Sequence, residues 1–299
     1  MIHMDFTLTT QSVAKLVPPM PPFRAHGAMP CRIKETRMSR ILLPGLIAAS
    51  LLFSVPASAA GCWLFADGTG QPLSQQGECS QRLPPASTFK IPLALMGYDS
   101  GFLVDEQLPA LPFKAGDADF LPAWRETTTP SRWMDHSVIW YSQRLTEWLG
   151  EARFQQYVDH FDYGNQDLAG NPGKQDGLTQ AWLSSSLEIS PLEQASFLGK
   201  LVSGKLPVAA DAVRHTSAIM RQPDIDGWQV YGKTGMGYFK QANGSLDRQR
   251  PIGWFVGWAS KGDQTRIFVH TVLDKPGKQF ASVRAKEELF AALPDKLKQ

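Results

Sequence analysis

The sequence predicts an α+β fold of αβα layers, in which strands from both ends of the chain form one antiparallel sheet around an inserted helical region. Three observations predict it. Segments near both ends are aromatic and β-branched, the interior repeats its apolar residues every three to four positions, and no internal repeat or long linker divides the chain. With 299 residues, 43% of them hydrophobic, the chain is long enough to bury a sizeable core.

The first strand is expected at 62–65, where Cys-Trp-Leu-Phe precedes a turn at 67–70. The interior is expected to be helical, because its apolar residues recur at helical spacing between loops rich in Pro, Gly, Asp and Thr. The predicted helices cover 91–98, 140–149, 152–161 and 191–201.

Strands return near the end of the chain. The predicted ranges are 228–231, 254–258 and 266–273, and 260–263 forms a hairpin turn between the last two. An amphipathic helix over 282–298 closes the chain, with Ser282 as its expected cap.

The first 60 residues are expected to lie outside the folded domain. Residues 38–40 give a short positive start, 41–55 are almost entirely apolar, and 57–59 form a small-residue cleavage site. About fifteen apolar residues are too few for a comfortable membrane span, which needs roughly 20. We therefore interpret 1–37 as an upstream extension, 38–60 as a secretory signal and 61–299 as a single catalytic domain. The mature chain is expected in the periplasm of a Gram-negative-type bacterium, with no membrane span.

Two cysteines of the mature chain support export but allow two interpretations. Cys62 and Cys79 flank a turn-rich segment and could close a loop in an oxidising compartment. Alternatively, residues 59–62 form a lipoprotein cleavage box, which would leave Cys62 acylated and Cys79 free. The Leu that usually begins such a box is missing, so a disulfide is the favoured interpretation.

Charge and composition indicate a small-molecule ligand. The formal net charge is +2 and no Lys/Arg-rich run occurs, which argues against nucleic acid or an acidic membrane surface as a partner. The six histidines show no metal-ligand spacing, and no glycine-rich phosphate loop is present. We therefore expect neither a metal nor a bound organic cofactor, and the oligomeric state stays open.

A serine and a lysine stand three positions apart in Ser87-Thr88-Phe89-Lys90, just before a hydrophobic helix. This spacing puts the hydroxyl and the amine on one face, near a helix N-terminus whose dipole favours developing negative charge. Such a pair also occurs by chance at solvated helix starts. The apolar residues around Lys90 predict a buried helix instead, where a lysine is costly without a purpose. A serine nucleophile needs an activator, and burial of the lysine would provide one.

A second group of polar residues, Lys233-Thr234-Gly235, ends a predicted strand and is followed by Met236-Gly237. A solvated strand end would explain it if it stood alone. As part of a site, it would present a cation and a hydroxyl to a cleft, and its glycines would let a substrate approach the backbone closely.

The two motifs occur in the order S-x-x-K then K-T-G, which penicillin-recognising serine enzymes share. Between them lie Ser137-Val138-Ile139, just ahead of a helix, and Tyr163-Gly164-Asn165, just after one. The whole set resembles the class D β-lactamases, whose motifs are typically Ser-Thr-Phe-Lys, Ser-x-Val, Tyr-Gly-Asn and Lys-Thr-Gly. The resemblance covers the mature chain and implies a β-lactamase/transpeptidase-like fold. Ile139 departs from the usual Val, which keeps the pocket apolar but could change how water reaches the acyl bond.

The resemblance implies hydrolysis of the β-lactam ring, and hence antibiotic resistance, through an acyl-enzyme on Ser87. It implies that Lys90 carries a carbamate formed from carbon dioxide or bicarbonate (N6-carboxylysine), takes the serine proton and activates the deacylating water. Trp182 matches the tryptophan that steadies this carbamate by hydrogen bonding. Burial supports the modification, because it lowers the pKa of a lysine and makes the neutral amine available.

Further roles follow from the same resemblance. Ser137 would pass a proton to the leaving nitrogen, with Lys233 in electrostatic contact, and the backbone N–H groups of Ser87 and Met236 would bind the oxyanion. Arg284 would bind the substrate carboxylate together with Thr234 and Gly235. Tyr163 and Asn165 are expected to be structural, because a phenol with a pKa near 10 is a poor base.

Two other functions stay open. A penicillin-binding transpeptidase would release its acyl group slowly, and a β-lactam sensor domain would bind and stay acylated. Both usually carry a membrane anchor or transmembrane helices. Trp182 and the apolar second motif serve deacylation, so they favour hydrolysis.

Overall fold

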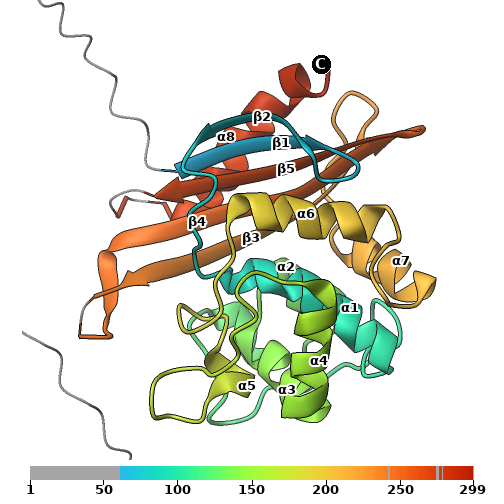
Figure 1. Cartoon of the computed structure of the whole chain (residues 1–299). Helices are drawn as coiled ribbons and strands as arrows, with labels where there is room; N and C mark the ends of the chain where they lie inside the picture. Colours follow the sequence, from blue (N-terminus) through green and yellow to red (C-terminus); the bar gives the residue numbers. More distant parts are fainter. Residues whose placement is uncertain (1–60, 242, 274–275, 278, 299) are drawn as a thin grey trace, which may run out of the picture. The chain divides into compact units, whose positions relative to one another are not determined.

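The structure is a computed structural model that describes residues 61–241, 243–273, 276–277 and 279–298 (Figure 1). The expected upstream extension, signal peptide and cleavage site all fall in residues 1–60, outside the described residues. None of the described helices is both long enough and apolar enough to cross a bilayer.

Five strands form one antiparallel sheet. In chain order they are β1 (Gly61–Asp67), β2 (Pro72–Gly77), β3 (Gln229–Lys240), β4 (Leu246–Lys261) and β5 (Gln264–Leu273). Their order across the sheet is β2-β1-β5-β4-β3, so β1 pairs with the last strand and β3 forms an edge. Leu64 of β1 stands opposite Val269 of β5. The sheet therefore joins the two ends of the domain, which confirms the predicted fold class.

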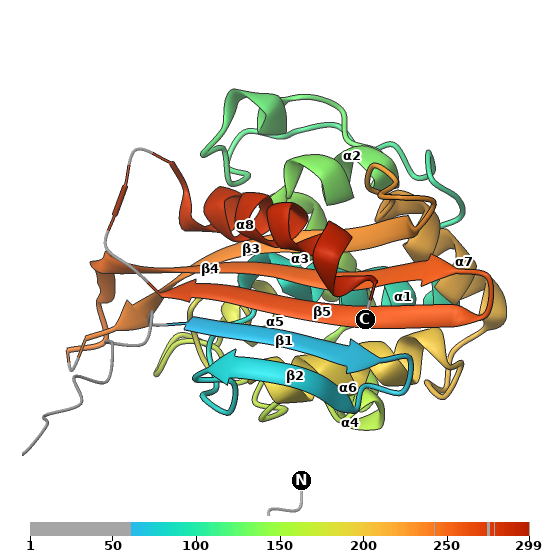
Figure 2. The same cartoon turned by 90° about the horizontal axis from the view of Figure 1, so that it is seen from above.

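Helices cover both faces of the sheet. The last helix, α8 (Ala281–Lys296), lies across β3, β4 and β5 on one face (Figure 2). Phe255, Phe268 and Leu289 belong to the apolar cluster on that side. The inserted helices pack on the opposite face over a larger apolar core (Figure 1).

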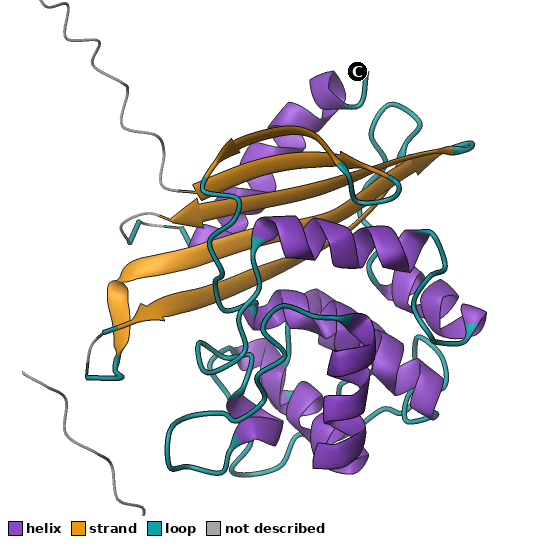
Figure 3. Ribbon diagram, in the orientation of Figure 1, coloured by secondary structure: helices purple, strands orange, loops and turns teal. Residues whose placement is uncertain are grey.

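The helices that the periodicity predicts are present, with bounds that differ by a few residues (Figure 3). They are α1 (Lys90–Ser100), α3 (Ile139–Leu149), α4 (Glu151–Phe161) and α6 (Pro191–Val202). The structure adds the shorter helices α2 (Pro130–His136), α5 (Gly177–Gln180) and α7 (Ala210–Ile219), and the 3₁₀ turns η1 (Ala86–Phe89) and η2 (Pro122–Arg125).

Several expected boundaries are wrong for identifiable reasons. β2 was not predicted because it is exposed along its whole length and lacks an apolar alternation. Lys233-Thr234-Gly235 lies in the middle of β3 and not at the end of a strand, since the glycines of this segment hide the strand pattern without stopping the pairing with β4. Ser282 is not a cap: α8 begins at Ala281, after Phe280, and no side chain caps it.

Cys62 and Cys79 form a disulfide, with their Cα atoms 5.0 Å apart. The bond ties the start of β1 to the chain just after β2. A Cys62 sulfur in this bond is not available for acylation, so the structure favours the disulfide over the lipoprotein alternative.

Candidate active site

Ser87 lies on η1, a single turn that leads directly into α1. The residue before it, Ala86, adopts a left-handed conformation with φ of 49°. A side chain in this region costs about 1–3 kcal/mol and persists only where the surroundings impose it. The turn is therefore held in a fixed and strained geometry.

Three contacts impose this geometry. The indole of Trp254 in β4 donates a hydrogen bond to the carbonyl of Pro84 at 3.1 Å. The N–H of Ala86 donates to the carbonyl of Trp182, also at 3.1 Å. Leu83 and Ile189 exchange two backbone hydrogen bonds. The turn is thus fixed from the sheet and from the segment that precedes α6.

The glycines of β3 allow close packing against this turn. A Cβ on Gly235 would come within 2.8 Å of the Pro85 carbonyl, and one on Gly237 within 3.1 Å of the Ser184 hydroxyl. On the side to which a Cβ would point, the space beside these two glycines is filled by the protein. They allow η1 to pack directly on β3.

Lys90 is fully buried, and its Nζ lies 3.4 Å from the Ser87 Oγ. Burial holds its pKa well below the usual 10.5, and repulsion from the Lys233 ammonium lowers it further. Desolvation disfavours the charged form of an amine, so burial favours a neutral nitrogen beside the serine. This is the condition for a base.

Trp182 lies beneath η1, entirely buried, with its ring stacked on Phe89 at 5.6 Å between centroids. Its indole nitrogen has no hydrogen-bond partner among the described residues. A buried N–H without an acceptor costs about 1–3 kcal/mol. The structure thus leaves a donor without an acceptor in the apolar cluster that contains Phe89, the residue before Lys90.

Ser137 occupies the corner between α2 and α3 in a left-handed conformation, with φ of 56°. Its neighbour Val138 is fully buried, and Ile139, the first residue of α3, packs against the same core. The Lys233 Nζ donates to the Ser137 Oγ at 2.5 Å, and it also contacts the Thr234 hydroxyl at 3.2 Å. Burial, and to a smaller extent repulsion from the Lys286 ammonium, lower the pKa of Lys233 to about 7.

The backbone N–H of Met236 lies on the open edge of β3. N–H groups alternate between the two edges of a strand. The N–H of Gly232 donates away from β4 to the Met220 carbonyl, and that of Tyr238 donates to the Ser184 hydroxyl. Met236 shares their parity, so its N–H points away from β4, to the open edge of β3.

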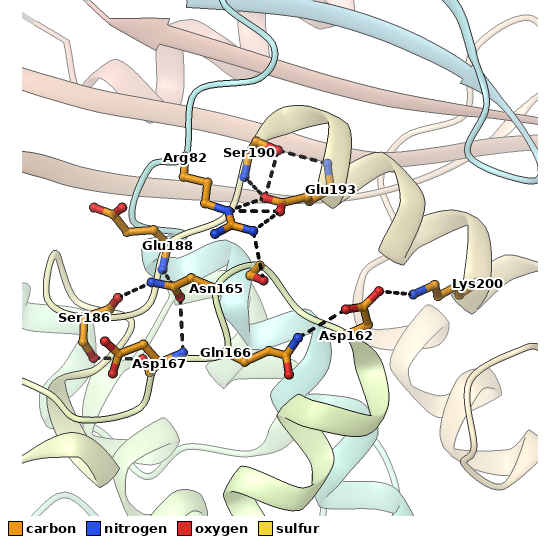
Figure 4. Close-up of polar contacts among 11 residues, drawn as sticks. Arg82, Asp162, Asn165, Gln166, Asp167, Ser186, Glu188, Ser190, Glu193 and Lys200 are labelled. Atoms are coloured by element: carbon orange, nitrogen blue, oxygen red, sulfur yellow. Dashed lines mark hydrogen bonds and ion pairs between the residues drawn. The ribbon is translucent and has the colours of Figure 1, made fainter.

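Tyr163 and Asn165 form hydrogen bonds around the turn that follows α4. The Tyr163 hydroxyl donates to the Gln194 side chain at 3.1 Å, and burial raises its pKa above the ordinary value. Asn165 donates to the Ser186 carbonyl and accepts from the N–H of Glu188 (Figure 4). Neither side chain is placed to transfer a proton.

An ion pair beside this turn was missed by the sequence reasoning. Arg82 makes a two-pronged contact with Glu193, and Ser190 completes a capping box with the same carboxylate at the start of α6 (Figure 4). The Ser-x-x-Glu spacing before an apolar run is a signal that could have revealed the capping box. The pair ties the chain before Ser87 to α6.

A pocket of about 480 Å³ opens beside Lys233 and Thr234, between α2, the end of α7 and β3. Lys286 of α8 is among the residues that line it, whereas Arg284 is not. Arg284 is partly buried on α8, two positions earlier. Among the described residues, no cluster of three potential ligands could hold a metal.

Comparisons with known proteins agree with this geometry. Residues 64–295 match the penicillin binding protein transpeptidase domain. The chain is 41% identical over 271 residues to the β-lactamase OXA-9 of Klebsiella pneumoniae, covering 86% of this chain and 98% of that protein. It is 36% identical over 240 residues to the β-lactamase OXA-1 of Escherichia coli, covering 78% and 83%. The crystal structure of the OXA-427 class D β-lactamase is 78% identical, with a TM-score of 0.79 over 80% of this chain and 99% of that one.

Proposed function

The chain belongs to the class D serine β-lactamases, and we propose that it hydrolyses penicillin-type antibiotics with Ser87 as nucleophile and a carboxylated Lys90 as general base. One observation carries the proposal. A buried lysine with a lowered pKa lies 3.4 Å from the serine oxygen, and the residue before it, Phe89, stacks on Trp182, whose indole N–H lacks an acceptor among the described residues.

The residues around Lys90 fit a carbamate. Carboxylation by carbon dioxide needs a neutral amine, which burial supplies. The reaction converts the neutral amine into an anion and releases a proton, and the Lys233 ammonium would attract that anion. The Trp182 N–H could donate to a carbamate oxygen and thereby satisfy a donor that is otherwise unpaired. The group supplies a base that stays unprotonated at neutral pH.

Acylation then follows from the remaining groups. The Ser87 oxygen attacks the lactam carbonyl as its proton passes to Lys90. The N–H groups of Ser87 and Met236 stabilise the oxyanion where η1 meets β3. Ser137 delivers a proton to the leaving nitrogen, and Lys233, with a pKa of about 7, can replace that proton through its 2.5 Å contact with Ser137. Water activated at Lys90 hydrolyses the ester and frees Ser87.

Rapid deacylation separates this function from that of a transpeptidase or a sensor, both of which stay acylated. The unpaired N–H of the buried Trp182, whose ring stacks on Phe89, supports deacylation specifically, because it would hold the base that activates water. We further propose that the enzyme works in the periplasm and confers antibiotic resistance. The Cys62–Cys79 disulfide supports an oxidising compartment.

Turnover of a chromogenic cephalosporin by the purified protein tests the proposal. The assay is run with and without added bicarbonate, alongside mass spectrometry of the acyl-enzyme and ¹³C NMR after labelling with ¹³C-bicarbonate. We expect bicarbonate to raise the rate and a carbamate resonance that is absent from Lys90→Ala. A single stable adduct without turnover would indicate a sensor or a transpeptidase instead.

A further inference from the structure

We infer that Gln194 of α6 is a positioning residue, which acts through Tyr163 to hold η1, the turn that carries Ser87, at a fixed distance from β3. The inference rests on the proposed function, in which the N–H groups of Ser87 and Met236 bind the oxyanion. The distance between η1 and β3 sets the spacing of these two donors.

A series of buried side-chain contacts leads from α6 to η1. The Tyr163 hydroxyl donates a hydrogen bond to the Gln194 Oε1 at 3.1 Å. The Thr88 side chain also lies within hydrogen-bonding reach of the Tyr163 hydroxyl. Within η1, the Thr88 hydroxyl donates to the Pro85 carbonyl at 2.7 Å. Thr88, Tyr163 and Gln194 are all fully buried, so water does not compete for these contacts.

Thr88, the residue after the nucleophile, is held by β3 as well. A Cβ on Gly235 would come within 2.9 Å of the Thr88 Cγ2 and within 3.1 Å of the Thr88 backbone nitrogen. Thr88 therefore lies between the strand and the Tyr163 phenol. Because protein interiors are closely packed, the position of the phenol fixes how closely η1 approaches β3.

The helix that carries Gln194 gives this arrangement a firm support. It packs against β1 and β5 (Figure 1). A Cβ on Gly70, in the turn after β1, would come within 2.6 Å of the Ala195 carbonyl oxygen. One on Gly199 would come within 2.3 Å of the Thr69 carbonyl oxygen. The backbone of α6 is thus in close contact with the sheet on the side away from η1, and it cannot shift without disturbing β1.

Packing alone does not explain a glutamine at position 194. Its amide nitrogen is buried and has no hydrogen-bond partner among the described residues. An unpaired buried donor costs free energy, and a leucine or methionine would fill a similar volume without that cost. The oxygen of Gln194 accepts from Tyr163, whose ring packs edge-on against Phe89 with 5.2 Å between centroids. We therefore assign the glutamine to the hydrogen bond that orients this phenol beside η1.

Gln194→Met removes the hydrogen bond and keeps much of the side-chain volume. A looser contact between η1 and β3 should weaken the transition states of acylation and of deacylation alike, because the same two N–H groups serve both. We expect each rate constant to fall about tenfold, less than the roughly hundredfold loss of a whole oxyanion donor. Single-turnover kinetics with a chromogenic cephalosporin would measure both. Added bicarbonate should restore neither rate, in contrast to a variant that weakens a carbamate on Lys90.

A second measurement does not depend on turnover. Phenylboronic acid forms a tetrahedral adduct with a serine oxygen and should bind Gln194→Met about tenfold more weakly than the unaltered protein. Tyr163→Phe removes the other end of the same hydrogen bond, so adding Gln194→Met to it should change the acylation rate little. Leu201→Val is the matched control, because it removes one methylene from the buried side of the same helix. It should lower the melting temperature and leave both rate constants and boronate binding unchanged.

The outcomes separate this inference from the proposed function. An unaltered protein that hydrolyses no β-lactam would refute the proposed function, and boronate binding would still test the position of η1. Hydrolysis with unchanged rates and unchanged boronate binding in Gln194→Met would overturn the inference alone. Losses in Leu201→Val equal to those in Gln194→Met would show a merely structural role and overturn it too. Fully additive losses in the double variant would show that Gln194 does not act through Tyr163. Should Gln194→Met fail to fold, Tyr163→Phe tests the same bond from its other end.

Discussion

The Lys233 ammonium donates to the Ser137 hydroxyl at 2.5 Å, although 96 positions separate the two residues in the chain. One lies in the middle of an edge strand and the other in the corner between two helices. Their contact joins the sheet to the helical region on the side of the site where the leaving nitrogen is proposed to lie. A second buried amine, Lys90, feels the charge of the first. The charge of Lys233 therefore affects the protonation of Lys90.

Lys90→Ala should abolish turnover, because it removes the base proposed for both acylation and deacylation. General bases typically contribute at least about a hundredfold to a rate. Stopped-flow kinetics with a chromogenic cephalosporin would measure the loss. Retention of the full rate would remove Lys90 from the mechanism.

Trp182→Phe should slow deacylation about ten- to a hundredfold, the loss expected for one hydrogen bond to a charged group. The phenyl ring keeps much of the packing on Phe89, so acylation should be affected far less. Mass spectrometry should detect an accumulated acyl-enzyme, and added bicarbonate should partly restore the rate. Equal losses in the two steps would contradict a specific role for the indole N–H.

Lys233→Met should make the stability of the protein less dependent on pH. The folded-state pKa of Lys233 is about 7, below the ordinary value of 10.5, so between these values the unfolded chain binds more protons than the native one. Stability linked to this group therefore rises as pH increases from 7 towards 10.5, and its full cost is present below pH 7. Denaturant unfolding at pH 6 and pH 9 should show a gain from the substitution that is larger at pH 6. A gain independent of pH would contradict a lowered pKa.

Removal of the disulfide by Cys62→Ser with Cys79→Ser should lower the free energy of unfolding by about 3 kcal/mol, from the loop-closure entropy of a short loop. The two cysteines are 17 positions apart. Urea unfolding of the double variant and of the oxidised protein would measure the difference. In the oxidised protein, Cys62 and Cys79 should not react with a thiol reagent, and labelling of these two positions would contradict the bond.

The sequence predicts the parts of the site that are contiguous, and it misses those that depend on distant pairing. Ser87 and Lys90 share one turn, so their spacing alone places them together. Arg82 and Glu193 are 111 positions apart and meet only because α6 packs beside the chain that leads to Ser87. No local pattern signals this pairing.

The same distinction applies to the fold. Apolar periodicity predicts α1, α3, α4 and α6, because each helix buries apolar side chains in the core. β2 is held by its pairing with β1 and buries no side chain, so it leaves no pattern. The glycines of β3 led to the prediction of a strand end, yet they lie within the strand, where η1 packs on the sheet. The sequence did not reveal this contact, because the closely packed partner lies about 150 positions earlier in the chain.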